Sequence, residues 1–582
     1  MILQELYHLA RQENLLEDPD YEPKAVPWVI DIGPGGRFLG FVRTQGQTSG
    51  EGEKKPRYDK GKMFNIPRHP VRASNIAACY LIDNMSYVFG KDERTPDRGP
   101  VKQKAFLELV SSAADETQGE GLRELLTFLQ NPEECKRALA AFEAQEGSPA
   151  DLMAFRYKGA FVHESPEARA FWAKQRAADA GCEKGVNCLV TGEPCVPVEM
   201  HPKLKNVPGG GTTGISLISF NSDAFESYGL SRCENAPLSR AASEGFSAAL
   251  NRLLDRQPVD LKTGESLSVL NKRLSDDTVA LFWTREKTEF TDIFQLLLDG
   301  DEEKVKAVFA APWKGKRPPL EDTSPFFAIV LSGAQGRATL RRWHTSTIAE
   351  TCKNLKQYFD DLEIVGQDHL PQIFALLSAI SAPGKNKNIP PQFAENIFES
   401  AISGARFSRA ILGAALLRIR AEGEITRPRA ALVKACLCRE LRRPDSDLKR
   451  KHPELMEVTK TMDPNCTNTA YRLGRLFAVL ERTQASAIGD PNATITRRFY
   501  SAASTRPALV FGSLLSLARH HLEKTDYAPR YEKLIEEILA PLSPDNAFPR
   551  VLNVEEQALF ALGFYHQKQS LFTKQNKTDN NA

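Results

Sequence analysis

Apolar and polar positions follow two different patterns along the 582 residues of this chain. In the first part, short apolar runs at 26–32 and 37–42 indicate strands, and the glycine-rich residues 33–36 between them predict a hairpin turn. After about residue 361 the apolar positions recur with a helical period that prolines interrupt. The sequence therefore predicts an α+β fold, in which a mixed N-terminal body with an antiparallel sheet and helices is followed by an all-helical C-terminal bundle.

The same patterns divide the chain into three expected segments. We expect an α+β body at 1–360, a helical and basic connector at 361–455, and a helical bundle at 456–582. Within the body, further strands or hairpins are expected at 64–67, 155–163, 278–283, 326–332 and 336–343, and a helix, or a loop and a helix, at 74–89 with Ser74 or Asn75 near its start. The length allows several domains, and the hydrophobic content of 41% supplies their cores.

One stretch of the body fits neither pattern. It begins with two lysines and continues with glycines and threonines: Lys203, Lys205, Gly209, Gly210, Gly211, Thr212, Thr213 and Gly214. Glycines let main-chain N–H groups approach a phosphate or a base edge, and lysines add positive charge. The stretch therefore favours a loop that binds a polyanion, followed by a strand at 215–220. A flexible connector between two strands is the alternative, and the spacing differs from that of mononucleotide-binding motifs.

The net charge of +2 conceals two local surpluses of positive charge. Residues 401–451 contain 13 Lys or Arg against 5 Asp or Glu, and residues 43–72 contain 8 against 3. Each cluster taken alone is also typical of a solvated helix or loop surface. Together with the lysines of the glycine-rich stretch, the two clusters favour contact with a nucleic-acid backbone.

The ten cysteines are irregularly spaced, and the sequence shows no apolar signal or transmembrane segment. We therefore expect a cytoplasmic chain with reduced thiols and no membrane association. Cys182, Cys188, Cys195 and His201 equal four zinc ligands in number. They lack a Cys-x-x-Cys pair, so buried or free thiols are the preferred interpretation, and we expect neither a metal nor another cofactor.

Few residues suggest catalysis. Asp276 and Asp277 precede an expected strand and would supply two carboxylates for Mg²⁺, although Asp is also common in such turns. His520 and His521 are adjacent on an expected helix, where they point about 100° apart. We expect a binding protein and not an enzyme. The alternatives are a metal-dependent nucleic-acid enzyme and a helical scaffold without nucleic-acid contact.

Several blocks of the sequence occur, in the same order, in one known family. They include MILQELYHLA, VPWVIDIGPGGRFLGF, FNIPRHPVRASNIAACYLIDNMSYVFG, CLVTGEPCVPVEMHPKLKNVPGGGTTGISLISFNSDAFESYG and YRLGRLFAVLERTQASAIGDPNATITRRFYSAASTRPALVF. On these blocks the chain resembles the large subunit of the type I-C CRISPR surveillance complex, Cascade. The resemblance covers nearly the whole chain.

The resemblance implies a non-catalytic subunit of an antiviral ribonucleoprotein. Such subunits lie beside the 5′ handle of the CRISPR RNA and read the short protospacer-adjacent motif (PAM) on double-stranded DNA. They promote duplex opening and R-loop formation, hold the displaced strand and help to recruit a helicase-nuclease. The implied partners are therefore CRISPR RNA, target DNA, the helicase-nuclease, and the backbone, handle-binding and small subunits of Cascade.

Reading a PAM requires polar groups at base edges and cations on phosphates. On the resemblance, the expected base-edge residues are Arg72, Ser74, Asn75, Thr212 and Thr213. Helix capping is the alternative role of Asn75. The expected phosphate contacts are Lys60, Lys62, Arg68, Lys203, Lys205, Gly209, Gly210, Gly211, Arg472, Arg475, Arg497 and Arg498.

The resemblance also implies that the helical end corresponds to the separate small subunit of other complexes. Met456 and Met462 precede this end, and translation from either would give a product of 127 or 121 residues. Two incidental methionines in a linker are the alternative.

Overall fold

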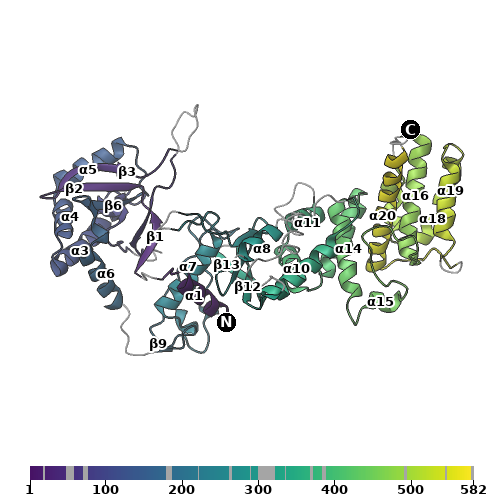
Figure 1. Cartoon of the computed structure of the whole chain (residues 1–582). Coiled ribbons are helices and arrows are strands. Elements are labelled where there is room, and N and C mark those ends of the chain that lie inside the picture. Colours follow the sequence, from purple (N-terminus) through teal and green to yellow (C-terminus); the bar gives the residue numbers. More distant parts are fainter. Residues whose placement is uncertain are drawn as a thin grey trace. The chain divides into compact units, whose positions relative to one another are not determined.

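The computed structural model describes residues 1–16, 20–47, 58–69, 76–178, 186–220, 222–260, 265–288, 290–298, 321–334, 336–366, 371–382, 389–489, 494–543 and 547–578 (Figure 1). Contacts within the chain divide it into two compact units. Unit 1 comprises residues 1–204, 218–252 and 257–267, and unit 2 comprises residues 205–217, 253–256 and 268–582.

Unit 1 is built on a five-stranded sheet in the order β3-β2-β6-β5, with β7 paired to β6. Its strands are β2 (Trp28–Gly33), β3 (Arg37–Arg43), β5 (Asp83–Asn84), β6 (Leu152–Tyr157) and β7 (Ala160–Phe161). The β2–β6 pair is parallel and the other pairs are antiparallel, so this sheet is mixed. A parallel pair needs a long crossover. The chain between β2 and β6 contains α3 (Gly99–Thr117), α4 (Glu120–Gln130) and α5 (Pro132–Ala144).

Aromatic side chains fill the core between this sheet and its helices. Trp28 of β2 is fully buried and meets Phe142 of α5 edge to face, with ring centroids 5.4 Å apart. Phe106 of α3 and Phe128 of α4 both contact Phe155 of β6. The apolar residues that predicted β2 and β6 therefore belong to one hydrophobic core.

The remaining elements of unit 1 are α1 (Ile2–Gln12), β1 (Tyr21–Ala25), β4 (Met63–Pro67), α2 (Met85–Val88), η1 (Pro96–Arg98), η2 (Val162–Glu164), α6 (Pro166–Ala178), β8 (Val186–Asn187), β9 (Pro194–Cys195), η3 (Asp223–Phe225), η4 (Arg232–Asn235) and most of α7 (Arg240–Leu254). The β1–β4 and β8–β9 pairs are antiparallel. The helix expected within 74–89 is the single turn α2. Asn84 caps it by accepting a hydrogen bond from the N–H of Ser86.

Unit 2 contains an antiparallel four-stranded sheet in the order β10-β11-β12-β13. Its strands are β10 (Asn271–Arg273), β11 (Thr278–Thr284), β12 (Pro325–Ala334) and β13 (Arg337–Thr347). Successive side chains of a strand point to opposite faces. Phe282 accordingly contacts Phe294 of α8 (Phe290–Leu298), with centroids 4.6 Å apart, whereas Trp283 contacts Trp343 of β13 at 5.7 Å. Both faces of β11 are therefore buried.

The described residues of unit 2 after this sheet are helical or irregular. The helices are α10 (Ile348–Leu362), α11 (Ile373–Ile380), α12 (Pro391–Ser403), α13 (Arg409–Glu422), α14 (Arg427–Leu441), α15 (Asp447–Lys451), α16 (Thr469–Ile488), α17 (Ile495–Ala503), α18 (Pro507–Leu522), α19 (Ala528–Leu539) and α20 (Val554–Thr578). Helices α16 and α20 pack side by side (Figure 1). A Cβ atom on Gly474 would clash with the carbonyl of Phe560, and one on Gly563 with that of Tyr471. Each helix thus needs its glycine where the two cross.

This division differs from the three expected segments. The β10–β13 sheet belongs to the same unit as the helical end, and α20 packs against α14 as well as α16. The contacts therefore place no unit boundary near residue 360 or 455. Independent folding of 456–582, and translation from Met456 or Met462, stay predictions.

Candidate nucleic-acid interface

The glycine-rich stretch forms a loop whose two ends are fixed to the β12–β13 hairpin. We term residues 205–216 the glycine loop. Near its start, the carbonyl of Pro208 accepts a hydrogen bond of 3.0 Å from the N–H of Gly333. At its end, the N–H of Ser216 donates to the carbonyl of Gly336 at 3.2 Å, and the carbonyl of Ser216 accepts from Ala338 at 2.9 Å. The predicted strand at 215–220 is wrong, because Ser216 forms only an isolated bridge, to Arg337.

The three consecutive glycines have different surroundings. Gly209 has a φ of 76°, and a Cβ atom there would clash with the carbonyl of Gly333. A Cβ atom on Gly210 would lie 3.0 Å from the carbonyl of Val207, whereas one on Gly211 would meet no atom within 4 Å. Close backbone packing within the protein therefore accounts for Gly209, and Gly211 remains open to a ligand.

The middle of the glycine loop is exposed. Thr212, Thr213, Lys203 and Lys205 all have exposed side chains. The pairing of Ser216 with Arg337 also brings a cation of β13 to the end of the loop. Sequence reasoning missed Arg337, because the pairing of the loop with a strand about 120 residues later leaves no local signal.

The basic segment at 43–72 divides into exposed and engaged cations. Lys60 and Lys62 are exposed. Arg68 is not, because its guanidinium donates to the carbonyl of Tyr21 at 2.9 Å and lies 3.6 Å from the carboxylate of Glu244. This arrangement does not fit the phosphate role expected for Arg68. The expected base-edge residues Arg72, Ser74 and Asn75 lie outside the described residues.

The second basic segment, 401–451, places three of its thirteen cations in the core of unit 2 and seven on the surface. Three buried cations on α14, Arg429, Lys434 and Arg439, each donate to main-chain carbonyls at the C-terminal end of a different helix. Arg429 binds the carbonyl of Ala379 at the end of α11, at 2.7 Å. A helix C-terminus carries unpaired carbonyls and partial negative charge, so a cation there is stabilising.

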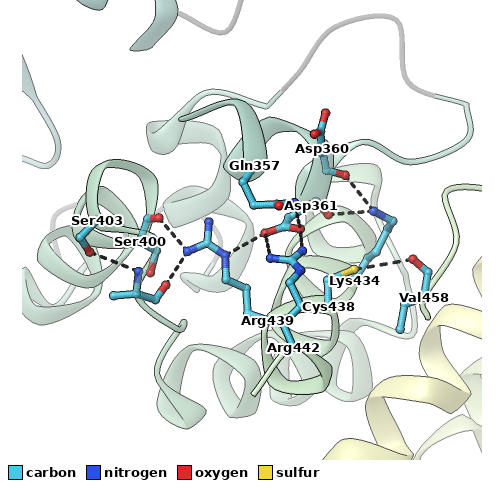
Figure 2. A network of polar contacts seen from close by, with 11 residues as sticks. Gln357, Asp360, Asp361, Ser400, Ser403, Lys434, Cys438, Arg439, Arg442 and Val458 are labelled. Atoms are coloured by element: carbon cyan, nitrogen blue, oxygen red, sulfur yellow. Dashed lines mark hydrogen bonds and ion pairs between the residues drawn. The ribbon is translucent and has the colours of Figure 1, made fainter. Parts of the chain in front are cut away.

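Figure 2 shows the other two of these contacts. Lys434 donates to the carbonyls of Asp360 and Asp361 at 3.1 and 3.0 Å, at the end of α10. Arg439 donates to the carbonyl of Ser400 at 2.8 Å, near the end of α12, and to the carboxylate of Asp361 at 2.8 Å. Arg442 pairs with the same carboxylate. Because Asp361 is buried, these cations serve the fold, and the segment is not a continuous phosphate-binding surface.

The expected arginines of the helical end fall into the same two classes. Arg472 and Arg475 of α16 are buried, and burial lowers the pKa of both guanidinium groups. Arg472 donates to the carbonyls of Glu537 and Ile538 at the end of α19, and Arg475 to the side chain of Gln567 on α20. This placement does not fit a phosphate role. Arg497 and Arg498 of α17 are exposed.

Comparison with known proteins adds one decisive observation. A family model described as CRISPR-associated protein (Cas_Csd1) matches residues 3–572, which include both units. This chain belongs to the Cas_Csd1 family. The match confirms that the protein is CRISPR-associated, as the resemblance implied. No curated protein matches the chain.

In this Cas_Csd1 protein, two of the four residues weighed as zinc ligands lie together. The β8–β9 hairpin brings the thiols of Cys188 and Cys195 into hydrogen-bonding contact. Burial raises the pKa of Cys188, but hydrogen bonds from Ser239 and Thr191 outweigh it and lower that pKa to about 7. His201 instead bonds the hydroxyl of Ser243 at 2.8 Å. Cys182 lies outside the described residues, and those described contain no group of three or more metal-binding side chains.

The two pairs considered for catalysis are held by neighbouring groups. The carboxylate of Asp277 accepts hydrogen bonds from the hydroxyls of Ser275 and Thr278, at 2.7 and 2.9 Å. Asp276 pairs with Arg273, and His520 lies 4.0 Å from Glu523. These contacts are typical of a turn before a strand and of an exposed helix. Among the described residues, no helix of the Cas_Csd1 protein is both long and apolar enough to cross a bilayer.

Proposed function

We propose that this Cas_Csd1 protein is the non-catalytic large subunit of a type I-C Cascade complex, and that it reads the PAM on double-stranded DNA. The family match over residues 3–572 supports membership of a CRISPR complex. The observation that carries the DNA-reading part is the glycine loop. Its residues 211–213 are exposed while both ends are hydrogen-bonded to the β12–β13 hairpin. A fixed loop that offers main-chain groups and hydroxyls suits contact with base edges in a groove.

In this proposal the contacts with DNA are few and divided by type. Thr212 and Thr213, with Asn75, read base edges. The exposed lysines Lys60, Lys62, Lys203 and Lys205 hold phosphates, and Arg497 and Arg498 of α17 lie along the guide–target duplex or the displaced strand. Pairing with the CRISPR RNA supplies the long sequence specificity, so a protein that reads only a short motif needs few base contacts.

The partners follow from this position in the complex. The protein acts in the cytoplasm and contacts the 5′ handle of the CRISPR RNA and the backbone, handle-binding and small subunits. After PAM binding it promotes duplex opening and R-loop formation, and it then helps to recruit the helicase-nuclease. It uses no metal or organic cofactor of its own.

The test uses the assembled complex and a panel of duplexes that share one protospacer and differ only in the flanking motif. A base contact discriminates by about 1–3 kcal/mol, so the best and worst motifs should differ in affinity by about tenfold or more. Equal affinity for every motif would contradict the proposal. The chain alone, incubated with labelled DNA and Mg²⁺ or Mn²⁺, should leave the DNA intact, and cleavage would instead favour a metal-dependent enzyme.

A further inference from the structure

One loop exposes an aromatic ring that the fold does not use. Residues 222–235, which we term the anchor loop, contain a tight turn in which the N–H of Leu230 donates to the carbonyl of Ser227 at 3.0 Å. Both central residues have positive φ angles, 56° at Tyr228 and 70° at Gly229. Such a turn favours Asn-Gly, because left-handed backbone strains a residue with a bulky side chain.

The side chain of Tyr228 does not offset this strain within the chain. It is 99% exposed, the largest exposed fraction among the large hydrophobic side chains that the structure describes. Asn or Gly would form the same turn with less strain. Strained residues that the surrounding structure holds in place cluster at functional sites. A role of the ring itself therefore explains why tyrosine occupies this position.

The rest of the anchor loop holds the backbone of the turn in one place. The side-chain oxygen of Asn235 accepts hydrogen bonds from the N–H and the hydroxyl of Ser227, at 3.1 and 3.2 Å. Its amide nitrogen donates to the carbonyls of Leu230 and Arg232, at 2.8 and 3.0 Å. One buttressing side chain thus fixes both sides of the turn. A turn fixed in this way loses little backbone entropy when the ring binds.

The surroundings of the ring are apolar and acidic. Phe225 and Leu230 are 43% and 42% exposed, and they enlarge the apolar surface. The charged residues of the loop are Asp223, Glu226, Arg232 and Glu234, which give three carboxylates against one guanidinium. Hydrogen bonds from Ser231 lower the pKa of Glu234, so it is ionised at neutral pH. An acidic rim repels phosphates and attracts cations, which favours a protein partner over nucleic acid.

We propose that the anchor loop docks on another resident protein subunit of the same complex, with the ring of Tyr228 in an apolar pocket whose rim carries lysine or arginine. Tyrosine is enriched among the residues that dominate binding energy at protein interfaces, because its ring buries a large apolar area and its hydroxyl still finds a polar partner. The choice of partner rests on the proposed function; the presence of a docking surface rests on the geometry of the loop.

The first test compares three full-length variants co-expressed with CRISPR RNA and the other subunits. Tyr228→Asn keeps the turn and removes the ring, Tyr228→Phe keeps the ring, and Tyr527→Ala removes another exposed ring as a matched control. We expect Tyr228→Asn to melt at or above the wild-type temperature but to weaken binding to the resident subunits by about tenfold or more. Tyr228→Phe and Tyr527→Ala should stay within about threefold of wild type. Unchanged assembly with Tyr228→Asn would overturn the proposal.

The second test places the photocross-linking residue p-benzoylphenylalanine at position 228 of the assembled complex. We expect a cross-link to a peptide of another resident subunit, with Lys or Arg near the linked residue. A cross-link to RNA or DNA would instead assign base stacking to the ring. A cross-link only to a second copy of this chain, or only to the helicase-nuclease, would also overturn the proposal.

These tests separate the inference from the proposed function. Discrimination among PAM sequences by the wild-type complex tests the proposed function and does not depend on Tyr228. The cross-link and the Tyr228→Asn variant test the docking surface whether or not the complex discriminates.

Discussion

The cations of α14 and those next to the glycine loop produce the same signal in the sequence and opposite structures. Arg429, Lys434 and Arg439 are buried, and each donates to the end of a neighbouring helix. Lys203 and Lys205 are exposed and lie at the start of a loop whose middle is open. A local surplus of positive charge therefore predicts a nucleic-acid surface only where the cations do not already cap helices.

Replacing a buried cation of α14 should change the stability of the protein more than any other substitution considered. Arg439→Met leaves the buried carboxylate of Asp361 with fewer partners. It also removes the donor to the carbonyls of Ser400 and Ala405. Breaking a buried ion pair from one side costs about 3–5 kcal/mol. We expect a loss of this size in the free energy of unfolding, measured by denaturant titration. The control Arg450→Ala removes an exposed cation of α15 and should cost less than about 1 kcal/mol. Similar stabilities for the two variants would contradict the structural role of α14.

The glycine loop offers a comparison between neighbouring glycines. Gly209→Ala must adopt a positive φ and displace the carbonyl of Gly333, so it should cost about 2 kcal/mol or more of stability. Gly211→Ala enters open space and should leave stability within about 0.5 kcal/mol of wild type. If the main chain near Gly211 approaches DNA closely, the Gly211→Ala variant should bind target DNA more weakly than the wild type. Thermal melts and DNA titrations of both variants distinguish a packing role from a binding role, and equal melting temperatures would refute the assignment of Gly209.

Replacing both Lys203 and Lys205 by Ala should weaken binding without changing the preference among DNA sequences. Each phosphate contact contributes about 0.9 to the slope of log K against log salt concentration. Loss of two contacts should therefore reduce the magnitude of this slope by about 2 in titrations of the assembled complex. The melting temperature should stay the same. An unchanged salt slope would rule out phosphate contacts by these lysines.

The smallest expected effect concerns the junction before the helical end. The imidazole of His452 lies 3.2 Å from Glu556 on α20, and hydrogen bonding to this carboxylate raises the pKa of His452. A raised folded-state pKa stabilises the fold below the unfolded value of about 6.5, and this contribution is lost as the pH rises through the folded value.

Melting curves of wild type and His452→Gln at several pH values check this. The wild type should be more stable than the variant by about 1 kcal/mol or less at pH 6, and the difference should shrink towards pH 9. The control is the buried His201, whose pKa is lowered to about 4 by burial. Its contribution to the free energy of unfolding changes in the opposite direction, because stability falls as the pH drops below about 6.5. A difference that does not depend on pH would contradict the ion pair.

Short apolar runs predicted many of the strands because the residues within a strand determine much of its tendency to form. These short apolar runs predicted β2, β3, β11, β12 and β13. The parallel pairing of β2 with β6 was not predictable in this way, because it depends on a crossover of more than a hundred residues. The expected strand at 215–220 failed because Ser216 forms an isolated bridge to Arg337 that is not continued into a ladder.

The candidate site was predictable in part. The glycines and lysines at 203–214 stand out locally, whereas the attachment of their loop to Gly333 and Gly336 does not. The burial of Arg429, Lys434 and Arg439 has a weak sequence signal, since the residues between these cations are almost all apolar. Tyr228 was missed because the sequence shows neither its exposure nor its positive φ angle, and only that angle reveals the strain.

The most direct test of PAM reading by the glycine loop is the affinity of the assembled complex for two duplexes that differ only in the PAM. It should be measured for the wild type and for the Thr212→Ala/Thr213→Ala variant, whose side chains are exposed and whose melting temperature should not change. We expect the wild type to prefer one duplex by about tenfold or more, and the variant to lose a large part of this preference. A variant that keeps the full preference would show that the glycine loop does not read DNA, and a wild type without any preference would contradict PAM reading altogether.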